Sequence, residues 1–69
     1  MNENEVEALV RSVIVHIGLP FALLSVIESP AGWNILVRAG TGGMVRFNVL
    51  GARPLAMRIA IQEKLESAL

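Results

Sequence analysis

Apolar and polar positions recur along this chain with two different periods, and the order of the periods predicts its architecture. From Glu5 to Ile17 apolar residues return every three or four positions, which is typical of a helix with one buried face. The same spacing returns from Pro54 to Ala68 and predicts a second helix. The buried stripe of the first helix is expected to hold Val6, Leu9, Val10, Val13, Ile14 and Ile17.

Three strand-like runs lie between the two helical stretches, over residues 21–28, 33–38 and 44–50. In the second run Ile35 and Val37 alternate with polar or outward positions, and in the third run Val45 and Phe47 do the same. Successive side chains of a strand point to opposite faces of the sheet. These two strands therefore predict an apolar inner face and an outer face that carries arginine.

The sequence does not indicate which side chains of the first strand point inward, because almost every position in it is apolar. One arrangement points Ala22, Leu24 and Val26 inward, and the other points inward the alternate set of Phe21, Leu23, Ser25 and Ile27. Either arrangement leaves apolar side chains on the uncovered face of the sheet.

Turn and capping residues mark where the elements end. Ser29-Pro30-Ala31-Gly32 predicts a tight turn between the first two strands, and a glycine-rich tract over residues 39–43 predicts the next hairpin loop. Asn4 with Glu7 predicts a capping box at the start of the first helix, and Gly18 predicts its end. The chain is thus expected to be one α+β domain over residues 1–69. Its expected fold is α-β-β-β-α, a three-stranded antiparallel meander with both helices packed on one face.

The apolar content exceeds what so small an interior can hold. Hydrophobic residues make up 54% of only 69 residues, and a domain of this size buries only about 60% of the surface of its unfolded chain. Some apolar side chains should remain outside and favour a protein partner or a homodimer. The candidate interface residues on the sheet and the last helix are Phe21, Leu23, Leu36, Leu55 and Ile59.

No arrangement of reactive residues suggests an enzyme. His16 is the only histidine, there is no cysteine, and the carboxylates are scattered rather than paired across a cleft. We therefore expect no catalytic residue, no metal site and no cofactor. The apolar run from Val13 to Ile27 is too short, and too broken by Gly18 and Pro20, to span a bilayer, so no membrane association is expected and the chain is predicted to be cytoplasmic.

Charge is balanced in total but uneven along the chain. Between Ala8 and Gln62 there are five arginines and one acidic residue, Glu28, so this segment has a net charge of +4 while the whole chain is neutral. Four of these arginines lie at outward strand positions or near the start of the last helix, and are the candidate nucleic-acid contacts: Arg38, Arg46, Arg53 and Arg58.

The start of the last helix carries a resemblance to a known family. With the α-β-β-β-α order, the residues from Ala52 to Ala60 make the chain similar to the double-stranded-RNA-binding domain, whose last helix opens with basic residues followed by small ones. Arg53 matches one of the family's phosphate-contacting positions, and Ala56 and Ala60 match its small packing positions. The resemblance implies this fold and contact with the phosphates of duplex RNA.

The chain also departs from that family at defined positions. Met57 occupies a second basic position of the family, with Arg58 one residue beyond it, and Pro54 occupies a third. The loop from Ser29 to Gly32 is shorter than the family's and lacks its Gly-Pro and histidine. Two classes of function stay open from the sequence: weak nucleic-acid binding through the arginines, and a protein-interaction or homodimer module that uses the open sheet face.

Overall fold

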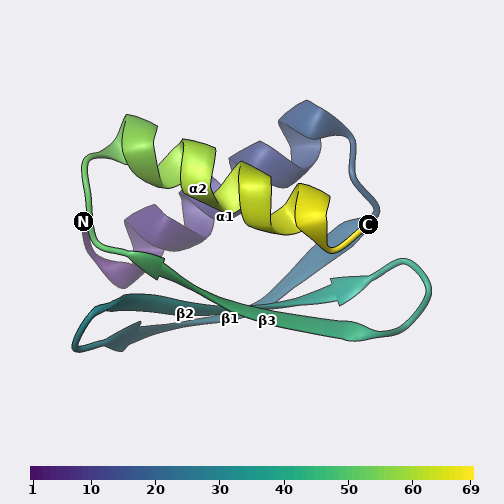
Figure 1. Cartoon of the computed structure of the whole chain (residues 1–69), viewed down its shortest axis with the longest axis horizontal. Helices are drawn as coiled ribbons and strands as arrows, with labels where there is room; N and C mark the ends of the chain where they lie inside the picture. The colour runs from purple at the N-terminus through teal and green to yellow at the C-terminus, as the bar shows by residue number, and fades with distance from the viewer.

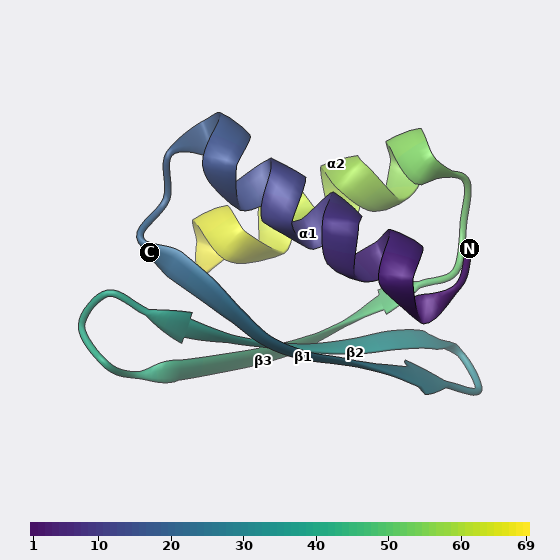
Figure 2. The same cartoon turned by 180° about the vertical axis from the view of Figure 1, so that it is seen from behind.

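The computed structural model describes all residues 1–69 and contains two helices and three strands. In chain order these are α1 (Glu3–Ile17), β1 (Phe21–Ser29), β2 (Gly32–Ala39), β3 (Met44–Leu50) and α2 (Pro54–Ser67). The strands form one antiparallel sheet in the order β1-β2-β3. Both helices lie side by side on the same face of the sheet (Figures 1 and 2), so the expected α+β architecture is confirmed.

The core lies between the two helices and the covered face of the sheet. Ile35 and Val37 on the central strand are fully buried, as expected from their alternation with outward residues. Val45 and Phe47 on β3 also face the helices but are only partly buried, because β3 is an edge strand. The helices contribute fully or almost fully buried side chains to this core, namely Val6, Val10, Val13, Met57, Ile61 and Leu65.

A β-bulge decides which face each residue of β1 occupies. Leu23 pairs with Val37 and Ser25 pairs with Leu36, so Leu24 between them has no partner on β2. An extra residue of this kind reverses the alternation of side chains beyond it. The strand can therefore bury Phe21 before the bulge and Val26 after it while Ser25 stays on the other face. Neither of the two regular arrangements expected from the sequence is correct.

The bulge corrects two of the expected interface residues. Phe21 is buried on the covered face, and Leu23 packs against the core from the same face. Neither side chain is on the open face of the sheet, where a partner would meet it.

The capping box of α1 lies two residues before the predicted one. The Asn2 side chain accepts a hydrogen bond from the backbone N–H of Glu5, and the Asn2 backbone N–H donates to Glu5 Oε1, both at 2.9 Å. The helix accordingly begins at Glu3 rather than Glu5. Its predicted end is confirmed, because Gly18 adopts the left-handed conformation with φ of 66°.

This difference in the cap gives a direct test. Asn2→Ala should lower the free energy of unfolding by about 1 kcal/mol, because the first turn loses its side-chain acceptor. Asn4→Ala, inside the helix, should leave stability unchanged or raise it by a few tenths of a kcal/mol, because alanine has the higher helix propensity. Urea denaturation followed by circular dichroism measures both, and a larger loss for Asn4→Ala would show that the helix begins later.

The last helix begins with Pro54, as predicted, and turns three large side chains toward the core: Met57, Ile61 and Leu65. Neither helix of the chain combines the length and the apolar character needed to cross a lipid bilayer.

Candidate functional site

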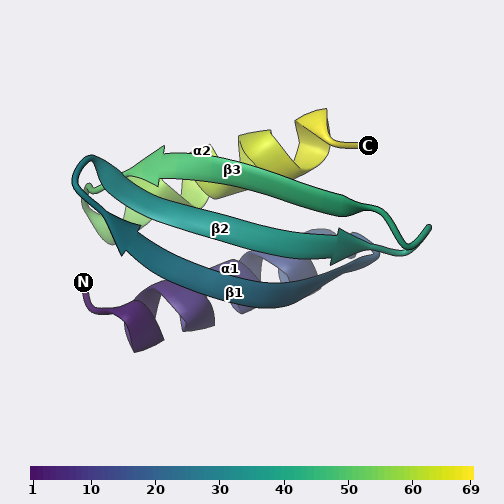
Figure 3. The ribbon, with the colours of Figure 1, turned by 90° about the horizontal axis from the view of Figure 1, so that it is seen from below.

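One face of the sheet has no helix over it. Seen from below, the three strands lie in front of both helices and nothing covers them (Figure 3). The register places the side chains of this open face in rows, since directly paired residues of neighbouring strands point to the same side. One row holds Ser25, Leu36 and Arg46. The neighbouring rows hold Ile27, Asn34 and Asn48 on one side, and Ala22, Arg38 and Met44 on the other.

The four arginines expected to contact nucleic acid do not lie on one surface. Arg38 and Arg46 are exposed on the open face, where they are diagonal neighbours on β2 and β3. Arg53 is exposed at the N-cap position of α2, and its side chain makes no capping hydrogen bond. Arg58 is partly buried on the same helix. The structure therefore brings Arg38 and Arg46 together on the sheet, and it places Arg53 and Arg58 on the helix layer.

Arg58 has a partner within the fold. Its Nη1 donates a hydrogen bond of 3.1 Å to Ser12 Oγ, which joins α2 to α1. Arg58 is thus a packing residue between the helices as well as a cation on the surface.

His16 follows Ser12 by one helical turn and is exposed, with no other histidine or cysteine in the chain to accompany it.

The exposed apolar residues expected at an interface likewise lie on two different surfaces of the domain. Leu36 is partly buried in the middle of the open face. Leu55 and Ile59 lie on the outward side of α2 and are 71% and 51% exposed. Leu36 and the pair on α2 are therefore separated by the full thickness of the domain, and one flat partner surface cannot meet both.

The open face also carries exposed apolar side chains that were not among the interface residues named from the sequence. Ile27 on β1 is 61% exposed, Met44 and Leu50 on β3 are 63% and 68% exposed, and Leu24, the unpaired residue of the bulge, is 44% exposed. Ile27 and Leu24 could be identified only with the bulge in place, because it sets their orientation. Outer faces of antiparallel sheets that meet only water are usually polar. This face is therefore suited to contact with another molecule.

A short polar network lies at one end of the same face. Asn48 Nδ2 donates to Asn34 Oδ1 at 3.0 Å and lies 3.2 Å from Ser29 Oγ, so the three strands are linked across their outer side. Next to it, a shallow hollow of about 360 Å³ lies over Leu36, with Ile27 at one rim and Arg46 at the other. An apolar group seated there would have a cation within reach.

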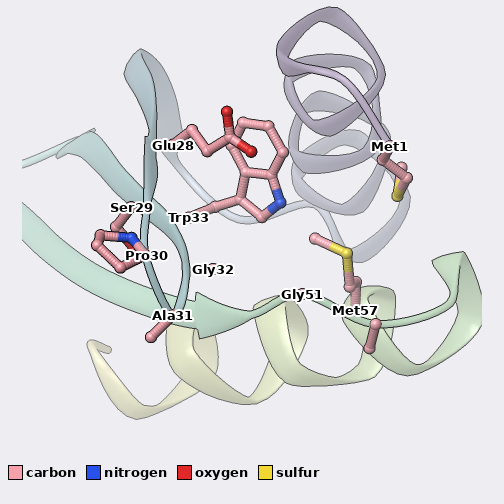
Figure 4. Close-up of a pocket in the computed structure, with 10 residues that line it drawn as sticks. Met1, Glu28, Ser29, Pro30, Ala31, Gly32, Trp33, Gly51 and Met57 are labelled. Atoms are coloured by element: carbon pink, nitrogen blue, oxygen red, sulfur yellow. The ribbon is translucent and has the colours of Figure 1, made fainter.

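A second hollow, of about 430 Å³, lies at the end of the domain beside the β1–β2 turn (Figure 4). The indole of Trp33 and the side chain of Met57 point toward each other there, and both are buried. Glu28, the register partner of Trp33, is the one charged side chain in its lining. Because Glu28 has no second ionisable side chain beside it in this lining, the open sheet face is the stronger candidate site.

Comparison with known proteins gives no family assignment. The chain matches no protein-family model, no curated protein and no solved structure. The structure shows a helix, three antiparallel strands and a second helix, with one face of the sheet open.

Proposed function

We propose that this chain is a small non-enzymatic binding module that engages a protein partner through the open face of its sheet. The observation that carries the proposal is the exposure of Ile27, Met44 and Leu50 on the one face that no helix covers. Burying apolar surface gains about 25 cal/mol for each Å² removed from water. The fold itself does not use these side chains, so this gain is available to a complex.

A second copy of the chain fits this face less well. A twofold contact brings the same patch of both subunits together. Two open faces in contact would bring four arginines, Arg38 and Arg46 of each subunit, into one interface, and the face supplies no carboxylate side chain to neutralise them. A homodimer through Leu55 and Ile59 on the helix layer would avoid this repulsion but would leave the sheet face uncovered.

Nucleic acid is the rival ligand, and the likeness to double-stranded-RNA-binding domains supports it. The placement of the arginines supports it less, because Arg38 and Arg46 are on the sheet whereas Arg53 and Arg58 are on the helix layer. A single phosphate backbone would meet only one of these pairs. Few phosphate contacts mean weak binding that disappears as salt is raised.

A peptide-display selection against the intact protein tests the proposal. Ile27→Thr with Leu50→Thr removes apolar surface from the open face while keeping residues that favour strands, and Leu55→Gln with Ile59→Gln is the matched control on the helix layer. We expect selected peptides to lose at least tenfold in affinity for the first variant and to bind the control as they bind the original protein.

Other outcomes of the same experiment would assign the surface differently. Peptides that depend on Leu55 and Ile59 would place the site on the helix layer and overturn the proposal. A complete absence of peptides that depend on the open face would also overturn it. Duplex RNA that binds in parallel titrations, and is lost with Arg38→Gln and Arg46→Gln, would assign the face to nucleic acid. Dimers in sedimentation that resist the open-face substitutions would assign self-association to the helix layer.

A further inference from the structure

Apolar and polar side chains on the open face are arranged along a diagonal. Ile27 on β1 pairs with Asn34, two residues before Leu36 on β2, and Leu36 pairs with Arg46, two residues after Met44 on β3. Ile27, Leu36 and Met44 therefore form a line that crosses all three strands. Each step along it joins diagonal neighbours, which are about 7–8 Å apart in an antiparallel sheet.

Polar side chains border this apolar diagonal on both sides. Asn34 and Arg46 lie along one side of it, since Asn34 is one row closer than Leu36 to the β1–β2 turn and Arg46, in the row of Leu36, is one row closer to that end than Met44. Ser25 and Arg38 lie along the other side. Each border thus contains one arginine and one neutral polar residue.

The charge on this face has a single sign. Of the chain's six acidic side chains, five are on the helices, and Glu28 shares the covered side of the sheet with its register partner Trp33. No acidic side chain of the chain therefore shares the open face with Arg38 and Arg46. A partner that brings carboxylates to both borders would neutralise them, and a partner that brings lysines would be repelled.

An amphipathic helix matches this layout better than an extended strand does. A helix presents an apolar stripe with flanking positions on both sides of it. Three helical turns of 5.4 Å each are about as long as the two diagonal steps from Ile27 to Met44. A strand presents only one row of side chains to a surface, because alternate residues point away. Carboxylates in that row would take the place of apolar groups instead of bordering them.

We propose that the open face binds a partner's amphipathic helix whose narrow apolar stripe is bordered by carboxylates on both sides. The stripe lies along Ile27, Leu36 and Met44, and the two acidic borders meet Arg38 and Arg46. This inference rests on the proposed function, because it names the chemistry of the protein partner for the same face.

Two synthetic helices of equal length test the inference. Both carry the same leucine stripe, and its borders are glutamate in one peptide and lysine in the other. We expect the glutamate-bordered helix to bind the protein at least tenfold more tightly, and to shift the NMR signals of Ile27 and Leu36. Its affinity should fall as salt is raised, because exposed charges are screened.

Charge-neutral variants of the protein give the matched control. Arg38→Gln with Arg46→Gln should weaken binding of the glutamate-bordered helix roughly tenfold, since both cations beside the stripe lose their ion pairs with glutamate. Arg53→Gln, which removes an exposed arginine on the helix layer, should leave the affinity unchanged.

The inference and the proposed function fail in distinguishable ways. Equal binding of both peptides, tighter binding of the lysine-bordered one, or no binding of either would overturn the inference. Displayed peptides that depend on Ile27 and Leu50 but lack acidic borders would overturn it as well, and would leave the proposed function standing. If the proposed function is wrong, the peptide-display selection will yield no peptide that depends on the open face.

Discussion

Replacing Gly32 with alanine is expected to remove about 3 kcal/mol or more of stability, a large part of the total for a chain of this length, which is about 3–10 kcal/mol. Gly32 begins β2 with φ of 155°, a backbone conformation that other residues rarely adopt. A Cβ atom there would overlap the carbonyl oxygen of Val49 and would lie 2.8 Å from Leu50 Cα. These neighbours are backbone atoms of β3, so a side-chain rotation cannot relieve the clash.

Gly43→Ala is the matched control for this prediction. Gly43 lies in the β2–β3 loop without a positive φ, and a Cβ atom there would meet nothing within 4 Å. Its replacement should change the free energy of unfolding by less than about 0.5 kcal/mol. Urea denaturation followed by circular dichroism compares the two variants. Equal stability of Gly32→Ala and the original protein would show that β3 does not pass so closely over the start of β2.

The second large effect is expected from Ile35→Ala. Ile35 is fully buried on the central strand beneath the helices, so its truncation leaves a cavity and should cost about 2–5 kcal/mol. Ile27→Ala makes the same truncation on the opposite face of the sheet, where Ile27 is 61% exposed. This second change should cost less than about 1 kcal/mol.

The single tryptophan provides the measurement for this pair. Trp33 is 6% exposed, so its fluorescence should change as the core opens in urea. Similar costs for Ile35→Ala and Ile27→Ala would contradict the assignment of the two faces. If the Ile27→Ala protein stays folded but no longer binds a peptide selected against the original protein, Ile27 contributes to binding and not to stability.

Much of the fold could be predicted from local pattern because the relevant signals are local. The apolar spacing of both helices, the alternation around Ile35 and Phe47, the left-handed Gly18 and the position of Pro54 each depend on a few neighbouring residues. The capping box could not be placed in this way. Both Asn2 with Glu5 and Asn4 with Glu7 have the required spacing, and the pattern alone does not distinguish them.

The candidate site was harder to predict, because it depends on pairing between strands. β1 is so apolar that its own sequence does not determine where the bulge lies. The bulge is at Leu24 because of how the side chains of β1 pack against β2 and the helices. The expectation for Phe21 and Leu23 was wrong for that reason. The separation of Arg38 and Arg46 from Arg53 and Arg58 is likewise a property of the layers, and charge counted along the chain does not contain it.

The most direct test of the open face as the binding surface is to measure where a selected peptide sits on the intact protein. A soluble paramagnetic probe relaxes the methyl signals that solvent reaches, and a bound peptide shields those beneath it. We predict that peptide binding will protect the methyl groups of Ile27, Leu36 and Leu50 and leave those of Leu55 and Ile59 as accessible as before. Protection of Leu55 and Ile59 with no change at Ile27 and Leu36 would show that the peptide binds the helix layer and not the open face.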